Sequence, residues 1–267
     1  MKKILLLAIL PFNICFYAQS IIWQDDFENP GTWILNSSIG TNGLDANSWF
    51  ISDAEGGVAP GNCGIAGNGN KTLHVGCQGA WCVGSGATYN AGDGGFGIID
   101  ATTNKRVYNS TNINTLNMGT LNLSFDYIGI GQPGADFGNV VYSVDGGSNW
   151  SILQGINSGT TCASGQGLWS SIVALLPAGC SNISTLRIGF EWHNDNDGAG
   201  SDPSLAINNV KITSPILTGG INDLNGFSSK KIVRITDLSG RVTVKRPGQI
   251  LILYFEDGTI ERVWIEE

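Results

Sequence analysis

The hydrophobicity of several short segments repeats with a period of two residues, and this period constrains the fold more than any other feature. Segments 121–127 (LNLSFDY) and 186–192 (LRIGFEW) alternate apolar and polar side chains. Such alternation is typical of antiparallel strands with one face in the core and one toward solvent. The apolar positions are Leu121, Leu123, Phe125 and Tyr127 in the first segment and Leu186, Ile188, Phe190 and Trp192 in the second. The chain is therefore predicted to be all-β.

Two interruptions of the alternation are informative. Segment 145–148 (DGGS) separates two short apolar runs, and its glycines accept positive φ, so it predicts a hairpin. In segment 205–212 (LAINNVKI) the apolar phase shifts at Asn208 and Asn209. We therefore expect a β-bulge at these two asparagines, a feature that re-aims side chains and is common near functional sites.

Residues 1–20 are predicted to be a secretory signal peptide. They combine a basic start, an apolar run and a small residue, Ala18, after which cleavage is expected. Cys15 raises the alternative of a lipoprotein, but the residues before it do not form the small-residue box of a lipid-attachment site. No later segment is apolar for long enough to cross a membrane. We expect a protein that is secreted or held at the cell surface.

The charge of the chain is distributed unevenly. Residues 21–229 contain five Lys and Arg against sixteen Asp and Glu. Because nucleic acid demands a basic surface, no interaction with nucleic acid is expected for this part. Acidic side chains in glycine-rich loops suit a hard cation such as calcium, which binds through oxygen atoms.

The C-terminal segment 230–267 follows a different composition, with seven of the fourteen Lys and Arg but only three of the thirty-eight glycines. Segment 214–229 before it contains Pro and Gly, does not alternate, and is predicted to be a linker. Beyond the linker, turn signals separate four short strand candidates, which predicts a small β-meander or sandwich. The candidates lie near 231–237, 241–245, 249–256 and 259–265.

Segment 230–267 resembles the type A C-terminal sorting domain of type IX secretion cargo, which is found in Bacteroidetes. The residues that carry the likeness are Asp237, Gly240, Arg241, Tyr254, Asp257, Gly258 and Arg262. The resemblance implies that the tail is an address read by the type IX secretion machinery. The alternative is an ordinary small β domain with common turns.

Residues 21–213 resemble the jelly-roll domains of secreted Bacteroidetes proteins that are akin to MAM and cleaved-adhesin domains. The likeness is carried by segments 26–33, 123–129, 142–150, 188–197 and 205–212. It implies an antiparallel jelly-roll sandwich that acts as a noncatalytic, adhesin-like recognition module for an extracellular glycan or protein. The alternative is an extracellular hydrolase or an accessory domain of a polymer-degrading system, because sandwiches carry many functions.

The same resemblance implies a structural calcium ion. In jelly rolls of this kind the first and last strands lie near one another, so Asp26 and Glu28 are expected to face Asn208 and Asn209 and to hold the ion with them. Relatives often have Asp where one of these asparagines stands, so the site should be weakened. The alternative is that Asp25, Asp26 and Glu28 are solvated and protect a sheet edge from pairing. Segment 193–198 (HNDNDG) also has a calcium-like oxygen pattern, but we interpret it as an acidic loop.

The glycine- and asparagine-rich segment 61–97 surrounds Trp81 and Tyr89. One hypothesis is that a sugar stacks on Trp81 or Tyr89 while Asn and Asp side chains bind its hydroxyl groups. The favoured alternative is a surface loop pinned by Cys77 and Cys82, with Trp81 packed against the sandwich, because large exposed aromatic side chains are costly unless used.

Five cysteines follow the signal peptide, and export makes disulfide bonds possible. We expect a bond between Cys162 and Cys180 across the loop that joins two strands. One further pair is expected among the first three cysteines, which leaves one free thiol. Zinc binding is the rival interpretation, but the spacings lack a paired C-x-x-C.

No known nucleophile or zinc-hydrolase motif is present, and the chain has only two histidines. The one catalytic hypothesis is a glycosidase pair of Glu191 with Asp195 or Asp197, which would need a defined separation across a cleft. Because proximity in sequence does not provide that geometry, a noncatalytic protein is expected. Trp150 and Trp169 are interpreted as side chains that pack at the sandwich edge.

Overall fold

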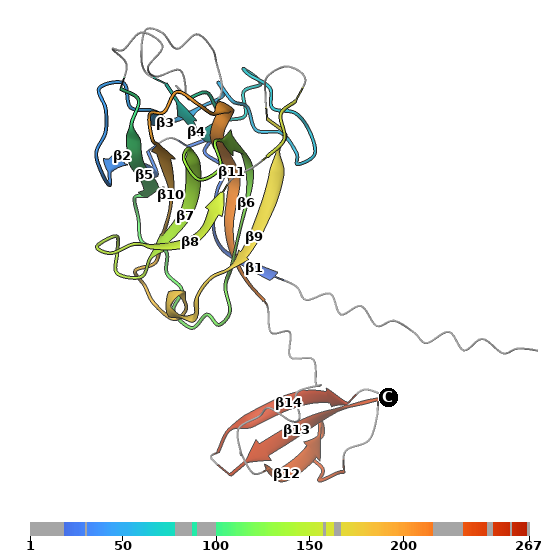
Figure 1. Ribbon diagram of the computed structural model, residues 1–267. Helices are drawn as coiled ribbons and strands as arrows, with labels where there is room; N and C mark the ends of the chain where they lie inside the picture. Colours follow the sequence, from blue (N-terminus) through green and yellow to red (C-terminus); the bar gives the residue numbers. More distant parts are fainter. Residues whose placement is uncertain are drawn as a thin grey trace, which may run out of the picture. The chain divides into compact units, whose positions relative to one another are not determined.

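The computed structural model describes residues 19–29, 31–77, 87–89, 100–156, 159–162, 167–215, 232–244, 248–256 and 258–265. The chain divides into two compact units, of which one is Gln19–Pro215 and the other contains the C-terminal strands. Nearly all of the regular structure is β-strand (Figure 1). None of the described residues belongs to a helix with the length and hydropathy needed to cross a bilayer.

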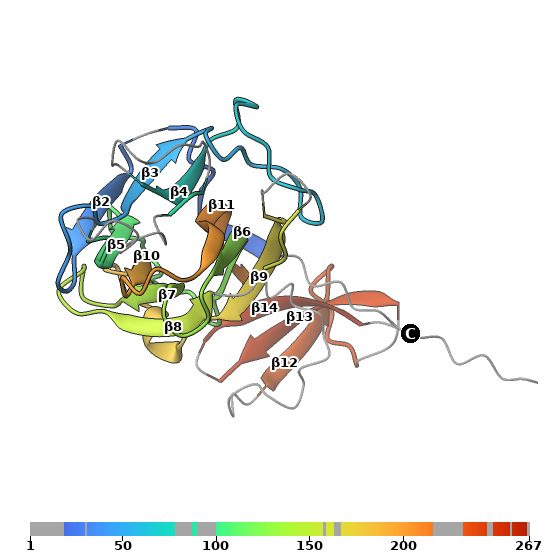
Figure 2. The same cartoon turned by 45° about the horizontal axis from the view of Figure 1, so that its top comes forward.

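Two antiparallel sheets make up the first unit. One has the order β3-β4-β11-β6-β9, with β1 also paired to β11, and the other has the order β2-β5-β10-β7-β8. Figure 2 shows the two sheets on opposite sides of the sandwich. The first sheet contains β1 (Gln19–Asp25), β3 (Ser48–Ser52), β4 (Thr72–Gly76), β6 (Asn122–Gly131), β9 (Ser170–Leu175) and β11 (Ser201–Pro215). The second contains β2 (Trp33–Ser38), β5 (Thr103–Asn109), β7 (Phe137–Ser143), β8 (Ser151–Ile156) and β10 (Arg187–Asn194). The predicted all-β, antiparallel jelly-roll sandwich is confirmed.

The core lies between the two sheets, where the alternating segments place it. Leu123 and Phe125 of β6 and Ile188 and Phe190 of β10 are each at most 1% exposed. The rings of Phe125 and Phe190 meet edge to face across the sheets, with centroids 5.3 Å apart. Aromatic pairs favour this geometry because the positive edge of one ring meets the negative face of the other.

Both predicted interruptions of the alternation are confirmed. Gly146 and Gly147 have φ angles of 74° and 96° in the turn between β7 and β8. The register of β11 against β6 shifts between Asn208 and Lys211, and Asn209 has a φ of 52°. The bulge lies where β11 stops pairing with β4 and starts pairing with β1, so one long strand serves two neighbours along the same edge.

The predicted Cys162–Cys180 bond is wrong. Cys162 is bonded to Cys63, 99 residues earlier, and Cys180 is a buried free thiol. Backbone pairing explains why Cys63 is the partner of Cys162. Cys63 forms a β-bridge with Leu168, and this bridge brings Cys63 close to the part of the chain that contains Cys162. Cys180 instead lies in the 3-10 helix η1 (Ala178–Cys180) with its side chain in the core. Cys77 is also disulfide-bonded.

The C-terminal unit contains an antiparallel three-stranded sheet in the order β12-β13-β14. Its strands are β12 (Ile232–Asp237), β13 (Gln249–Phe255) and β14 (Ile260–Ile265). Residues 241–244, the described part of the candidate strand near 241–245, do not form a strand, although Val242 makes an isolated bridge with Thr236. After β12 the Asp237 carboxylate accepts hydrogen bonds from the backbone N–H groups of Ser239 (2.8 Å) and Arg241 (3.0 Å), which shape a tight turn at Gly240.

Candidate functional site

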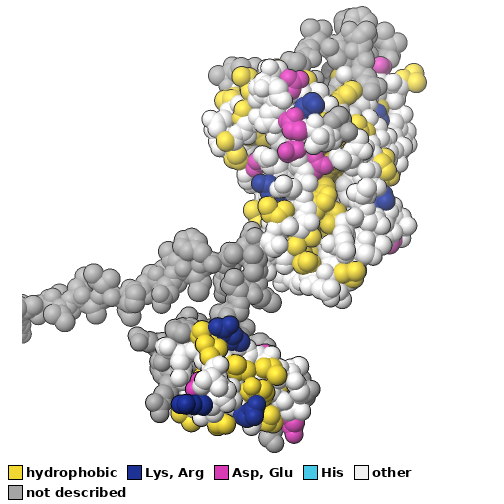
Figure 3. All heavy atoms as spheres, turned by 180° about the vertical axis from the view of Figure 1, so that it is seen from behind, with side chains coloured by type: hydrophobic (Ala, Val, Ile, Leu, Met, Phe, Trp, Pro, Cys, Tyr) yellow, Lys and Arg dark blue, Asp and Glu magenta, His cyan; other side chains and the backbone are white. Residues whose placement is uncertain are grey.

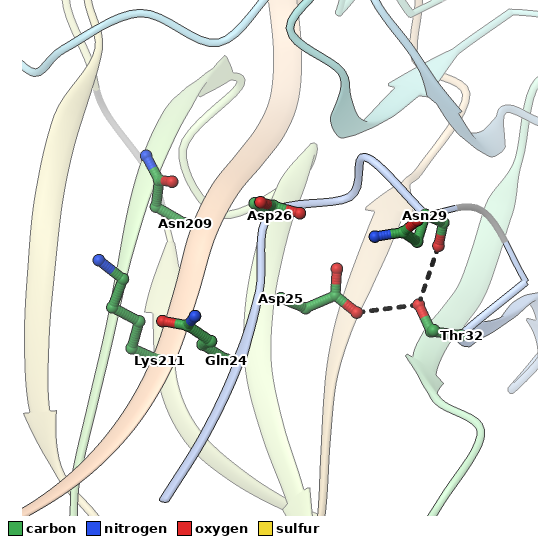
Figure 4. Close-up of a pocket in the computed structure, with 7 residues that line it drawn as sticks. All are labelled: Gln24, Asp25, Asp26, Asn29, Thr32, Asn209 and Lys211. Atoms are coloured by element: carbon green, nitrogen blue, oxygen red, sulfur yellow. Dashed lines mark hydrogen bonds between the residues drawn. The ribbon is translucent and has the colours of Figure 1, made fainter. Parts of the chain in front are cut away.

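The four residues predicted to hold calcium separate into two pairs. Asp26 and Asn209 line a pocket of about 500 Å³ beside β1 and β11 (Figure 4). The other lining residues are Gln24, Asp25, Asn29, Thr32 and Lys211. Asn209 donates through its amide nitrogen to Asp126 Oδ2 at 2.8 Å. The bulge therefore directs Asn209 toward a neighbouring side chain as well as toward the pocket.

The neighbouring carboxylate in this pocket, Asp25, has a structural role. It accepts hydrogen bonds from the Phe27 N–H (2.8 Å), the Thr32 hydroxyl (2.8 Å) and the Trp33 indole N–H (3.1 Å). Figure 4 shows Asp25 turned toward Thr32. These bonds tie the end of β1 to the start of β2, so Asp25 fixes the loop between them.

The second pair of predicted ligands lies near residues 70 and 71. Glu28 accepts a hydrogen bond from the backbone N–H of Lys71 (2.8 Å), and the Lys71 ammonium donates to the Glu28 carbonyl (3.3 Å). Asn208 is buried and donates to Asn70 Oδ1 at 3.4 Å. Among the described residues no three His, Cys, Asp or Glu side chains gather as a metal site would need. A calcium ion at these four residues stays a prediction.

Of the two predicted sugar-stacking residues, Tyr89 is the one that the structure describes. Trp81 lies outside the described residues. Tyr89 is only 5% exposed, and its ring packs edge to face against Trp192 with centroids 5.5 Å apart. Its backbone N–H donates to Asp202 at 2.8 Å. The prediction for Tyr89 is therefore wrong, because the core covers the ring that a sugar would need.

A richer set of side chains lies on the outer face of the five-stranded sheet. Because side chains alternate, the residues of β10 between its core positions point outward, and the registers of β5 and β7 place polar and aromatic residues beside them. We name this set the β10 face. It consists of Asn104, Arg106, Tyr108, Phe137, Asn139, Trp150, Arg187, Glu191 and His193.

Trp150 is the central aromatic residue of the β10 face. It follows the hairpin turn, and its indole N–H donates to the Gly147 carbonyl at 3.0 Å. A Cβ atom on Gly189 would lie 3.1 Å from the indole, so this glycine leaves space for the ring on the sheet. The Trp150 and Tyr108 rings have centroids 5.1 Å apart, and both side chains are partly exposed. The Arg106 guanidinium lies 4.8 Å from the Trp150 ring centroid.

An ion pair lies next to these rings. Arg106 donates from Nε (2.9 Å) and Nη2 (2.6 Å) to Glu191 Oε1. Glu191 Oε2 has longer contacts, at 3.5 Å, to the Asn139 amide and to His193 Nε2. Burial raises the pKa of Glu191, but the nearby His193 and Arg106 outweigh this effect and hold the pKa below its ordinary value. Glu191 is therefore ionised, with one oxygen less engaged than the other.

His193 forms the other end of the face. Its Nδ1 is 2.9 Å from Asn104 Oδ1, and its ring stacks on Phe137 with centroids 4.9 Å apart. These contacts fix the orientation of the imidazole. From Arg187 to His193 the outward positions of β10 span about 20 Å, because a strand rises roughly 3.3 Å per residue.

Glu191 does not suit the general-acid role in the glycosidase pair suggested by the sequence. A carboxyl group that acts as a general acid needs a raised pKa. Glu191 has a lowered pKa and an arginine partner, which favour the ionised form.

The sequence interpretation of Trp150 as an edge-packing residue is wrong, whereas Trp169 is fully buried. Gly189 is the sequence feature that could have predicted the position of Trp150. It occupies an outward position in an alternating strand, where a missing side chain leaves room for a ring from elsewhere.

The far side of the sandwich differs in character. Figure 3 shows hydrophobic side chains on the side seen from behind, together with a group of acidic and basic side chains. Exposed hydrophobic residues of the six-stranded sheet include Ile21 on β1 and Val173 and Leu175 on β9, and the strongly exposed large hydrophobic residues among those described are all Ile, Leu or Val. On the β10 face, by contrast, the partly exposed Tyr108 and Trp150 rings lie next to arginine side chains.

These features define a class: a two-sheet jelly-roll sandwich with an aromatic and charged outer face. No family model and no curated protein matches the chain. Among solved structures, it is similar to the K1 cleaved adhesin domain of Lys-gingipain from Porphyromonas gingivalis W83, at 18% identity and a TM-score of 0.43, over 74% of this chain and 98% of that one. It is also similar to the CBM22-1 xylan-binding domain of Paenibacillus barcinonensis Xyn10C, at 11% identity and a TM-score of 0.38, over 75% of this chain and 98% of that one.

Proposed function

We propose that the sandwich is a noncatalytic glycan-recognition module and that the β10 face binds the glycan. The observation that carries this proposal is the position of Trp150, which lies over Gly189 beside Tyr108 and Arg106 on the outside of the sheet. A partly exposed indole supported from below offers a flat apolar surface to the C–H groups of a sugar ring. Large aromatic side chains at a surface are costly unless they are used.

The polar groups around Trp150 suit the hydroxyl groups of a sugar. Arg106 and Asn104 are partly exposed and present polar groups on this face, whereas Glu191 and Asn139, at 5% and 7% exposed, are buried and support them. The ion pair with Arg106 and the stacking of His193 on Phe137 hold these groups in place before a ligand arrives. Such preorganisation lowers the entropy that binding must overcome.

Replacing Trp150 with alanine should weaken glycan binding about thirtyfold or more, which corresponds to roughly 2 kcal/mol, because the stacking surface is lost. The measurement is a glycan array, run with calcium and with chelator, followed by titration of the glycans retained. Val173→Ala is the control, because this residue of β9 is 73% exposed and belongs to the other sheet. Unchanged binding by Trp150→Ala would show that the face is not the site.

We further propose that the C-terminal unit is a type IX sorting signal and that the protein is exported by that route to the cell surface or medium. The resemblance of segment 230–267 motivates this proposal. The turn made by Asp237, Gly240 and Arg241 and the packing of Arg234 over the Tyr254 ring, 4.1 Å from its centroid, support it by giving the motif residues defined shapes. Asp257 lies outside the described residues.

A chain that ends at Gly226 should accumulate in the periplasm of a host with type IX secretion, because it keeps the signal peptide and loses the address. The measurement is fractionation of cells and medium with an antibody to the sandwich. A reporter preceded by residues 1–20 and followed by residues 216–267 should leave the same host. Appearance of the truncated chain in the medium at the normal level would disprove the sorting role.

A further inference from the structure

Arg187 is a cation without a charged partner on the β10 face. It is the first residue of β10 and points outward, in the same phase as Glu191. Its Nε donates to the Asn112 side chain at 2.8 Å, and its guanidinium lies 5.7 Å from the centroid of the Tyr108 ring. Among the described residues no carboxylate oxygen lies within 4.0 Å of it. The terminal nitrogens of this guanidinium are therefore available to a ligand.

The other charges on this face are already matched. Arg106 is paired with Glu191. In the β7–β8 hairpin, the Asp145 carboxylate accepts hydrogen bonds from the Ser143 hydroxyl (2.7 Å), the Asn149 N–H (2.9 Å) and the Asn149 amide (2.7 Å). Bonds from Asn149 and Ser143 lower the pKa of Asp145 to about 2, so it stays ionised and engaged locally. The unmatched charge on the face is thus the positive one of Arg187.

This unmatched charge contrasts with the composition of the domain. Residues 21–229 have sixteen acidic and five basic side chains, so carboxylates are abundant and a guanidinium has many chances of a partner. Arg106 and Arg187 are the two arginines in this range, and both lie against aromatic rings of the same face. A guanidinium presents a planar array of N–H donors that matches a carboxylate or sulfate geometrically. Its position beside Tyr108 places that array next to the aromatic surface.

We propose that the glycan recognised by the β10 face is acidic: a sugar that carries a carboxylate or a sulfate, held by Arg187 while a neighbouring ring of the same glycan packs on Trp150 and Tyr108. This inference rests on the proposed glycan-binding function and narrows it to a class of ligand. It also assigns the two arginines different roles, because Arg106 positions Glu191 whereas Arg187 contacts the ligand.

The test compares matched acidic and neutral probes with the purified protein. The probes are oligogalacturonate, its methyl ester and a sulfated galactan oligosaccharide, with neutral galactan and xylan oligosaccharides beside them. We expect binding of at least one acidic probe and at least tenfold weaker binding of the neutral ones. Preference for oligogalacturonate over its ester identifies the anion as a carboxylate, and preference for the sulfated galactan identifies it as a sulfate. Binding of the acidic probe should weaken as salt is raised, because exposed charges are screened.

Variants then assign the effect to Arg187. Arg187→Gln should weaken binding of the acidic probe at least tenfold and leave weak binding of neutral probes unchanged, and Arg187→Lys should recover part of it. Arg234→Gln makes the same change in the C-terminal unit and should have no effect. Two results would overturn the proposal that the glycan is acidic and leave the proposed glycan-binding function intact. One is that neutral glycans bind through Trp150 as tightly as acidic ones. The other is that the Arg187→Gln variant keeps full affinity for the acidic probe. Failure to bind any glycan would overturn both.

Discussion

Replacing Cys63 and Cys162 with serine should lower the free energy of unfolding by about 4 kcal/mol. The bond joins residues 99 apart, and a cross-link over so long a loop removes much of the conformational entropy of the unfolded chain. It also ties the segment around Cys63, which bridges to Leu168, to the segment that precedes Leu168. The measurement is urea unfolding of the double variant and the parent without reductant. Substitution is preferable to reduction, because Cys77 is in a disulfide bond too.

The buried free thiol provides the matched control for this experiment. Cys180→Ala removes one sulfur atom from a fully buried position, so it should cost roughly 1 kcal/mol through lost packing. If the double serine variant were no less stable than this control, the Cys63–Cys162 bond would not stabilise the fold.

Glu55→Gln should remove a loss of about 3 kcal/mol in the free energy of unfolding that the parent undergoes as the pH rises. Glu55 is 0% exposed, so its carboxyl group is shielded from water. Burial raises the pKa of Glu55 from 4.5 to about 7, and the backbone N–H of Ala87 offsets this only in part. The neutral carboxyl group therefore contributes stability that is fully present below about pH 4.5 and is lost as the pH rises to about 7. The glutamine variant lacks this loss.

The measurement is urea unfolding of the parent and Glu55→Gln at several pH values, expressed as the difference between them. The difference is needed because His74 acts in the opposite direction. Burial lowers the pKa of His74 to about 4, so its contribution to stability is lost as the pH falls from 6.5 to 4. From pH 4 to pH 8 the variant should gain about 3 kcal/mol relative to the parent. A difference that does not vary with pH would show that Glu55 ionises normally in the folded protein.

The strands and their faces were predictable because local hydrophobicity determines them. Phe190 and Trp192 alternate with polar residues over several positions, and a strand is the structure that buries one set and not the other. The bulge at Asn209 was predictable for the same reason, because an extra residue must shift the apolar phase. These features depend on neighbours in the sequence.

The candidate site was not predictable, because it joins residues that are distant in the chain. Arg106 and Glu191 meet through the register of β5 and β10, and Trp150 reaches them from a separate hairpin. No local pattern states which strands are neighbours. The partner of Cys162 escaped prediction for the same reason, because backbone pairing near Cys63 selects it. The sequence around Tyr89 is rich in Gly and Asn, which is typical of an exposed loop, yet the Tyr89 ring is buried against Trp192.

The position of β11 along the chain has a consequence for when the sandwich can fold. It is the last strand of the sandwich along the chain, yet it pairs with β1, β4 and β6. As the ribosome makes the chain, these three strands emerge well before the partner that all of them need. The six-stranded sheet cannot close until residue 215 has been synthesised, so the sandwich assembles late and from distant contacts.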